Sequence, residues 1–135
     1  MTAPARISPI AFVDTSAIVA LVDRDDATHE DAVNAYHSLV SDGYRLFTTN
    51  HVISETYDLL YSTLGEDIAR QWLGDVGLAI YITDSVDEEK ARERVLGSAN
   101  GRPMRYADAV SLSVMERLGV AEAFAVDPDF LDTMS

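Results

Sequence analysis

The sequence predicts a small three-layer α/β/α domain built around a mostly parallel sheet. Short apolar stretches of the kind that form buried strands alternate along the chain with helical patterns, as in βαβ units. The first such stretch, residues 10–13, leads into an aspartate and two hydroxyl residues that open a helix. The chain has 135 residues, with no repeat and no linker-like segment. We therefore expect a single domain spanning residues 1–135.

The expected elements follow a loose N-terminal segment, residues 1–9. The expected strands are residues 10–13, 44–49, 78–82 and 123–126. The expected helices are residues 15–22, 28–40, 51–63, 66–74, 85–96 and 106–118, with a loop over 99–103. Capping patterns bound several of these helices: Thr28 and Ser85 each open a capping box, Asn50 is an expected N-cap, and Gly97 and Gly119 are expected C-terminal stops.

Composition excludes several classes of protein. An apolar content of 47% indicates a globular chain. No apolar run reaches the roughly 20 residues of a membrane span, and no signal-peptide pattern is present. The chain has no cysteine, which excludes disulfides, a thiolate nucleophile and zinc–sulfur sites. We therefore expect a cytoplasmic protein with no membrane association.

The formal net charge of −13 has two opposed consequences. Taken alone it argues against nucleic-acid binding, because phosphate contacts require a basic surface. It favours divalent cations or a basic partner, because some of the 23 acidic side chains are expected to lie close together.

Four carboxylates stand at positions where a parallel sheet would bring them together. Asp14 follows the first strand and Asp127 the last, while Glu55 and Asp108 lie near the starts of two helices. Ligands of open α/β sheets bind just outside the carboxyl ends of the strands. Carboxylate clusters suit Mg²⁺ or Mn²⁺, which prefer oxygen ligands. Such metals activate a water and stabilise the leaving oxygen of a phosphodiester.

Helical periodicity distinguishes Asp108 from an ordinary surface acid. It shares a face with Leu112 and Met115, while Ser113 and Glu116 are expected on the solvent side, beside Arg117. An acid on a buried helix face favours a functional interpretation. The position of Glu55 is less distinctive, because it is expected at the edge of the apolar face of its helix.

Each of these acids also has a structural interpretation. Asp14 is a possible helix cap, Glu55 a half-exposed helix residue, and Asp108 the partner of an arginine. Asp127 lies in an Asp-Pro-Asp turn, and Asp129 competes with it as a fourth ligand.

Other polar and aromatic residues are expected to be structural. The histidines show no metal-ligand spacing, and His51 is expected on a helix surface. The acidic run over residues 84–89 is expected to be solvated, and Trp72 and the tyrosines to lie in the core or at a dimer surface. Arg102 and Arg105, in the loop that leads to Asp108, are candidates to hold RNA phosphates or to be solvated loop residues.

The chain resembles PIN domains, and more narrowly the VapC-type toxins of bacterial toxin–antitoxin pairs. The resemblance covers residues 10–130 and rests on segments that match in order and spacing: Phe12-Val13-Asp14-Thr15-Ser16-Ala17, Asp26-Ala27-Thr28-His29, Thr48-Thr49-Asn50-His51-Val52-Ile53-Ser54-Glu55, Tyr106-Ala107-Asp108-Ala109, Leu118-Gly119-Val120 and Ala125-Val126-Asp127-Pro128-Asp129-Phe130.

The resemblance implies a PIN-like fold and Mg²⁺- or Mn²⁺-dependent endonucleolytic cleavage of RNA by metal-bound water. It implies that Asp14, Glu55 and Asp108 bind the metal and that Asp127 assists. It further implies that Ser16 orients a ligand or contacts substrate and that Asn50 supports the site. The implied partners are RNA and a cognate antitoxin. We also expect the chain to form a homodimer through helical faces such as those around Tyr57–Leu60 and Trp72.

The sequence departs from its relatives at two places. Many relatives carry Ser or Thr just before the third acid, where this chain has Tyr106-Ala107. Relatives usually add a fifth strand after the segment that ends here at Ser135. The sheet is therefore expected to have four or five strands.

Three other functions compete with a nuclease. A haloacid-dehalogenase phosphatase needs a second acid two residues after the first, where this chain has Ser16. A receiver domain needs a lysine after a late strand, but the only lysine, Lys90, lies in a helix. A PIN-like module that binds a partner or RNA without cutting stays open because of the charge. Whether the chain cleaves RNA or only binds a partner, a basic antitoxin segment that places an arginine at a metal position would neutralise the acidic cleft.

Overall fold

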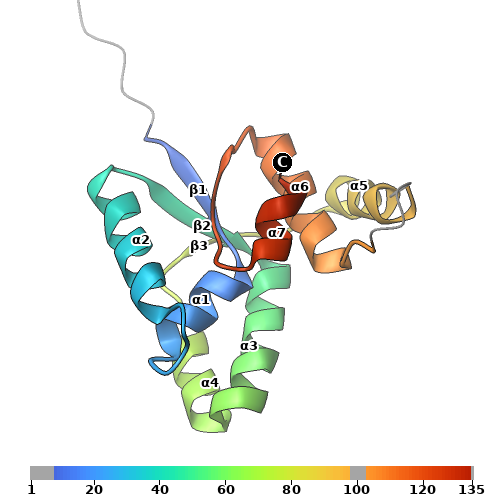
Figure 1. The fold of residues 1–135 in the computed structure, drawn as a ribbon. Helices are drawn as coiled ribbons and strands as arrows, with labels where there is room; N and C mark the ends of the chain where they lie inside the picture. Colours follow the sequence, from blue (N-terminus) through green and yellow to red (C-terminus); the bar gives the residue numbers. More distant parts are fainter. Residues whose placement is uncertain (1–7, 98–102, 135) are drawn as a thin grey trace, which may run out of the picture.

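The computed structural model describes residues 8–97 and 103–134, and a four-stranded parallel sheet lies at its centre (Figure 1). Its order is β3-β2-β1-β4, and every pair of neighbours is parallel. The strands are β1 (Ile10–Val13), β2 (Arg45–Thr49), β3 (Ala79–Tyr81) and β4 (Glu122–Phe124). The predicted α/β class and mostly parallel sheet are confirmed, and no fifth strand occurs within the described residues.

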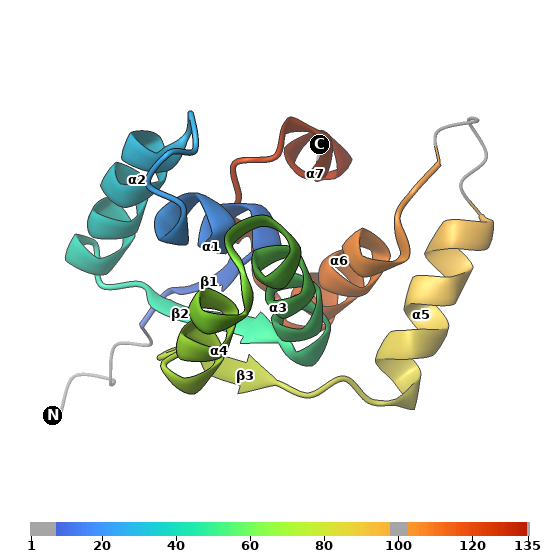
Figure 2. The ribbon, with the colours of Figure 1, turned by 90° about the horizontal axis from the view of Figure 1, so that it is seen from below.

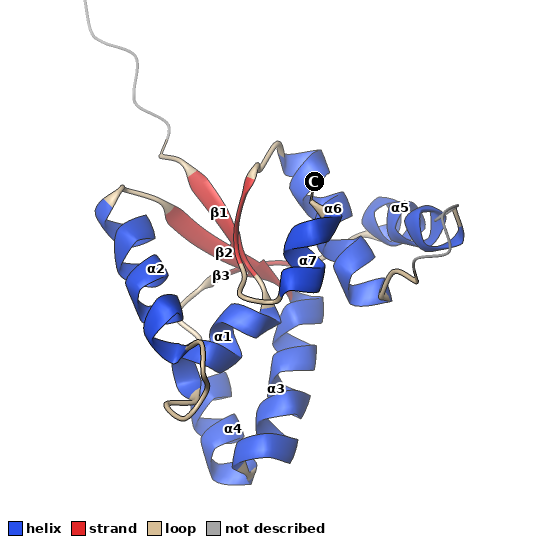
Figure 3. Cartoon of the chain, in the orientation of Figure 1, coloured by secondary structure: helices blue, strands red, loops and turns tan. Residues whose placement is uncertain are grey.

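Seven helices surround this sheet in the described part of the chain. They are α1 (Thr15–Val22), α2 (His29–Ser41), α3 (Asn50–Leu64), α4 (Glu66–Gly74), α5 (Ser85–Leu96), α6 (Tyr106–Leu118) and α7 (Pro128–Thr133). Helices α1 and α3 continue from the carboxyl ends of β1 and β2 (Figure 3). Helix α5 lies beside α6 at the outside of the molecule (Figure 2). The sequence predicted all of these helices except α7. None of the described helices is long and apolar enough to cross a bilayer.

The core is centred on β1. Ala11, Phe12 and Val13 are all buried, as expected for a strand covered on both faces. The ring of Phe12 meets that of Phe47 from β2 edge-on, with centroids 5.7 Å apart. It also meets Phe130 of α7 at 6.1 Å. Phe130 is fully buried, so this one aromatic side chain anchors α7 to the sheet.

Three predicted caps are shifted or replaced. Thr49, not Asn50, caps α3, accepting the Val52 N–H at 3.2 Å. Asp84, not Ser85, opens the capping box of α5. Thr28 stands at the start of α2 without capping it, because its hydroxyl donates to Asp26 at 2.6 Å. For α3 and α5 a neighbouring side-chain oxygen caps the helix, and for α2 the expected capping hydroxyl is engaged with Asp26. Sequence spacing does not resolve these choices.

The C-terminal stops of α5 and α6 are confirmed. Gly97 follows the last residue of α5, and Gly119 follows α6 in the left-handed conformation, with φ of 69°. Only glycine adopts this conformation without a steric penalty from Cβ. The cap turns the chain sharply from α6 toward β4, and thereby brings β4 alongside β1.

Two predictions of solvent exposure are wrong on the side where α5 meets α6. Asp87 is buried, and its carboxylate accepts from the Tyr81 hydroxyl at 2.8 Å and from Arg117 at 3.1 Å. Ser113 is buried as well, and it accepts a hydrogen bond from Arg94 of α5 at 3.0 Å. The packing of α5 on α6 covers a face that the periodicity of either helix alone assigns to water.

Candidate active site

Asp14 stands at the carboxyl end of β1 and is 8% exposed. Its Oδ2 accepts the backbone N–H of Ser16 at 3.3 Å and the Ser16 hydroxyl at 2.9 Å. Burial raises the pKa of the Asp14 carboxyl above its ordinary value, the bonds from Ser16 oppose the rise, and the charge of Asp127 adds to it. Asp14 therefore serves as the cap of α1 and also faces other carboxylates, so its two interpretations are compatible.

Ser16 joins the ends of β1 and β4. Its hydroxyl donates to Asp14 and accepts the backbone N–H groups of Val126 at 3.0 Å and Asp127 at 3.2 Å. This uses the one donor and both lone pairs of the hydroxyl. The hydroxyl thus fixes the orientation of Asp14 relative to the segment that carries Asp127.

Glu55 and Asp108 are half-buried acids on α3 and α6. Burial is the first cause that raises the pKa of each, and the charges of Asp14 and Asp127 contribute to both. The pKa of Asp108 is raised to about 6, with Asp14 as the largest charge contribution and Glu55 as a smaller one. The four predicted acids therefore lie near enough to repel one another, although they are far apart in sequence.

Asp127 caps α7, and its Oδ1 accepts the Asp129 N–H at 3.0 Å. Its charge acts on the other three acids, raising the pKa of Asp14, Glu55 and Asp108. Asp129 is not among the causes of these shifts. Of the two acids in the Asp-Pro-Asp segment, Asp127 is thus the one coupled to the cluster.

Arg105, just before α6, supplies a positive charge to this cluster. Its Nη2 lies 3.8 Å from Oε1 of Glu55, and its side chain is 70% exposed. Its charge lowers the pKa of Glu55 and of Asp108, opposing the effect of burial. Arg102, the other predicted arginine, lies outside the described residues.

The donor set fits Mg²⁺ or Mn²⁺ in its chemistry. All four clustered acids offer carboxylate oxygens, the ligands that these hard cations prefer. Their mutual repulsion, shown by the raised pKa values, would be relieved by a divalent cation. Among residues 8–97 and 103–134, no three acid or histidine side chains are close enough to form a ready-made metal site. Binding of a cation would therefore require the side chains of the four acids to move closer together.

Asn50 is the first residue of α3, and its role differs from the predicted cap. Its Oδ1 accepts the backbone N–H of Thr83 at 3.0 Å. This bond ties the start of α3 to the connection between β3 and α5. Asn50 thus supports the helix that carries Glu55.

A group of residues near these helix starts was missed by the sequence analysis. His51 pairs with Glu88 at 2.5 Å, and Glu88 also accepts from Thr83 and Tyr106. The predictions of a surface His51 and a solvated Glu88 are wrong. No local signal reveals such a group, because the paired residues lie far apart in the chain.

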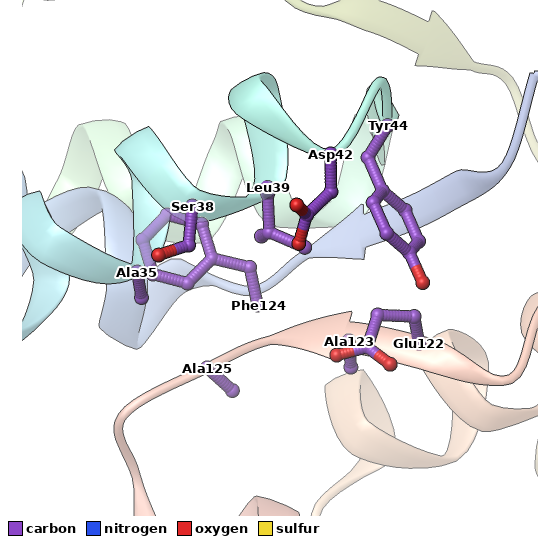
Figure 4. A pocket seen from close by; sticks show the side chains of 9 residues that line it. All are labelled: Ala35, Ser38, Leu39, Asp42, Tyr44, Glu122, Ala123, Phe124 and Ala125. Atoms are coloured by element: carbon purple, nitrogen blue, oxygen red, sulfur yellow. The ribbon is translucent and has the colours of Figure 1, made fainter.

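A hollow of about 320 Å³ lies elsewhere, between α2 and β4 (Figure 4). It is lined by Ala35, Ser38, Leu39, Asp42, Tyr44, Glu122, Ala123, Phe124 and Ala125. None of the four clustered carboxylates lines this hollow, so it is separate from the candidate active site.

Comparison with known proteins identifies the family. Residues 11–134 match the family described as "PIN domain". This chain belongs to the PIN-domain family. The predicted resemblance is thereby confirmed, and the match takes in all four clustered carboxylates.

Curated relatives of this PIN domain are named as VapC nucleases. A "23S rRNA-specific endonuclease VapC20" of Mycobacterium tuberculosis is 33% identical over 123 residues, covering 88% of this chain and 90% of the relative. A "VapC ribonuclease" of Archaeoglobus fulgidus is 33% identical over 111 residues, covering 80% of this chain and 71% of the relative. The crystal structure of the Mycobacterium tuberculosis VapC20, titled a sarcin-ricin loop cleaving toxin, superposes with a TM-score of 0.80. It is 31% identical and covers 92% of this chain and 94% of that one.

Proposed function

We propose that this PIN domain is a toxin-type endoribonuclease that depends on Mg²⁺ or Mn²⁺. The observation that carries the proposal is the charge coupling among Asp14, Glu55, Asp108 and Asp127 at the carboxyl edge of the sheet. The names of its relatives, which are nucleases, support the same reaction class. Action on cellular RNA would place the protein in the cytoplasm.

In this proposal Asp14, Glu55 and Asp108 hold the cation, and Asp127 assists. A bound cation would supply a water molecule of lowered pKa and would neutralise charge that develops on the phosphodiester. Ionised carboxylates are required to hold it, so the raised pKa of Asp108, about 6, makes cation binding depend on pH near neutrality. The catalytic roles of these residues are our proposal.

Other residues of the site have supporting parts. Ser16 keeps Asp14 in place through its 2.9 Å hydrogen bond. Asn50 holds the start of α3 through Thr83. In this proposal the guanidinium of Arg105 binds an RNA phosphate, a role that its exposure supports.

The test is cleavage of a labelled RNA pool that includes 23S rRNA, with Mg²⁺, Mn²⁺ or EDTA. The wild type is compared with Asp14→Asn and Asp108→Asn, each purified free of partner proteins and checked for folding by circular dichroism. We expect metal-dependent cleavage that both substitutions abolish. Equal cleavage by all three proteins would identify a contaminating nuclease, and an inert but folded wild type at high concentration would contradict the proposal.

The net charge of −13 supports a second candidate, a PIN-like module that binds without cutting. It also supports regulation by a basic antitoxin segment that lies over the acids and places an arginine among them. An arginine-containing peptide that competes with Mn²⁺ in calorimetry, and inhibits cleavage, would support regulation of a nuclease. Binding of the peptide by a protein that never cleaves RNA would favour the module.

We also propose that the chain forms a homodimer through α3 and α4. These helices pack against each other and expose large apolar side chains: Leu59, Tyr61, Ile68 and Leu73. The expected contact through Tyr57–Leu60 needs one correction, because Leu60 is fully buried and cannot contact a partner. Light scattering is expected to show a dimer that Leu73→Glu weakens, and a strictly monomeric wild type would contradict the proposal.

A further inference from the structure

The carboxylate of Glu88 joins three separate parts of the chain. Glu88 lies in the first turn of α5. Its Oε1 accepts from Nε2 of His51 at 2.5 Å and from the Thr83 hydroxyl at 3.0 Å. Its Oε2 accepts from the Tyr106 hydroxyl. One side chain of α5 therefore connects the starts of α3 and α6.

These bonds require an ionised Glu88. The pKa of Glu88 is held below its ordinary value, first by the hydrogen bond from Tyr106 and also by those from His51 and Thr83. An ionised carboxylate only accepts hydrogen bonds, so Nε2 of His51 must carry a hydrogen. Such charge-assisted bonds are about twice as strong as neutral ones.

The connected residues lie next to two of the clustered acids. His51 precedes Glu55 by one turn of α3, and Tyr106 precedes Asp108 by two residues. The rings of His51 and Tyr106 lie 6.1 Å apart. Among the described residues, Glu88 is the only side chain that hydrogen-bonds to both α3 and α6. Within the described part of the chain, the polar contact made directly between the starts of α3 and α6, without Glu88, is the 3.8 Å pair of Arg105 and Glu55.

A connection at this point has a mechanical consequence. Glu55 and Asp108 are acids on two helices that contact each other, α3 and α6, so repulsion between their like charges opposes a close approach of the helix starts. The bonds to Glu88 oppose this repulsion. Helix α5 packs along α6 (Figure 2), and this packing holds the helix that carries Glu88 in place.

We propose that Glu88 is a positioning residue that sets the separation of Glu55 and Asp108 by holding the start of α6 against the start of α3. The inference rests on the proposed function, in which these acids bind the cation. Residues that orient metal ligands typically change metal affinity 10- to 100-fold when mutated. Glu88 contacts neither the cation nor RNA in this role.

The experiment compares the full-length wild type with Glu88→Gln, which keeps the shape but replaces one acceptor oxygen with an N–H donor. Two quantities are measured: Mn²⁺ affinity by calorimetry, and hydrogen exchange of the first turn of α6 in the metal-free protein. We expect affinity to fall about 10-fold or more and exchange in that turn to rise.

Glu89→Gln is the matched control. Glu89 is the next residue of α5, is exposed, and has no hydrogen bond or ion pair with a described residue. This substitution removes the same charge at nearly the same place, so both measurements are expected to match the wild type. An equal effect of both substitutions would attribute the result to net charge and overturn the proposal.

The remaining outcomes separate the proposal from the proposed function. Unchanged Mn²⁺ affinity in a folded Glu88→Gln would overturn the positioning role, whether or not exchange rises. A wild type that binds no Mn²⁺ would refute the proposed function, and with it the role of Glu88 in positioning metal ligands. In that case faster exchange in Glu88→Gln would still show that Glu88 holds α6, because this readout needs no metal.

Discussion

The carboxylates of Asp14 and Asp108 repel each other at the edge of the sheet. After burial, the charge of Asp14 is the largest cause of the raised pKa of Asp108, which reaches about 6. The two residues stand on different elements, at the end of β1 and in the first turn of α6. Folding therefore brings together charges that the unfolded chain keeps apart, and this costs stability in the metal-free protein.

Removing one of these charges is expected to stabilise the metal-free protein while abolishing cleavage. Asp108→Asn takes away a partly buried charge but keeps the side-chain shape. Because Asp108 is half-exposed and solvent screens its charge, we expect the free energy of unfolding at pH 7 to rise by about 1 kcal/mol. Urea denaturation in EDTA measures this. Asp129→Asn, at an exposed acid outside the cluster, is the control, and a less stable Asp108→Asn would contradict the prediction.

The pH dependence of stability follows from the same shift. The pKa of Asp108 rises from an ordinary 3.8 to about 6 in the folded protein, so between these values the folded state binds more protons than the unfolded state. The free energy of unfolding of the metal-free protein is therefore expected to lose this contribution as pH rises through that window. The raised pKa values of Asp14 and Glu55 act in the same direction.

The measurement is the difference in unfolding free energy between the wild type and Asp108→Asn at several pH values. The pKa values of other acids, such as Asp26 and Asp84, are lowered, and their contribution to the stability of the protein is lost as pH falls. This contribution is the same in both proteins, so taking the difference removes it. We expect the advantage of Asp108→Asn to grow from pH 4 to pH 7. Saturating Mn²⁺ is expected to reverse the order by stabilising only the wild type. An advantage that is constant with pH would exclude Asp108 as the titrating group.

Ser16→Ala is expected to reduce metal affinity as well as stability. The substitution leaves the N–H groups of Val126 and Asp127 without their acceptor and frees Asp14 to rotate. Loss of these bonds is expected to cost about 1–3 kcal/mol in the free energy of unfolding. Calorimetry with Mn²⁺ is expected to show weaker binding, whereas Ser54→Ala, at an exposed serine of α3, should change neither quantity. Normal metal affinity in Ser16→Ala would limit the role of Ser16 to folding.

Arg105→Gln is expected to weaken RNA binding without abolishing metal binding. The exposed guanidinium beside Glu55 is replaced by a neutral side chain. Loss of one phosphate contact is expected to make the plot of log K against log salt less steep by about 0.7 for single-stranded RNA. Binding is measured with Asp108→Asn in the background to prevent cleavage, and Arg24→Gln, at an exposed turn, is the control. An unchanged salt dependence would show that Arg105 does not contact phosphate.

Sequence patterns predicted the architecture because they depend on local physics. Alternation of buried strands with amphipathic helices predicted the parallel sheet, and strand polarity placed Asp14 and Asp127 at one edge. The motif resemblance to PIN domains predicted the family, which the comparison confirms. Helical periodicity predicted the half-buried position of Asp108 correctly but placed Ser113 wrongly, because it does not reveal that α5 covers that face.

What the sequence alone determined was the kind of fold, the family and which acids gather at one edge. Tertiary structure decided the rest: which of Asp127 and Asp129 is coupled to the cluster, that Asn50 bonds to Thr83, and that Glu88 connects α3 to α6. The physical reason is range. Burial patterns and caps arise from neighbours within a turn or a strand, whereas the pairing of His51 with Glu88 spans 37 positions and exists only once the helices have packed.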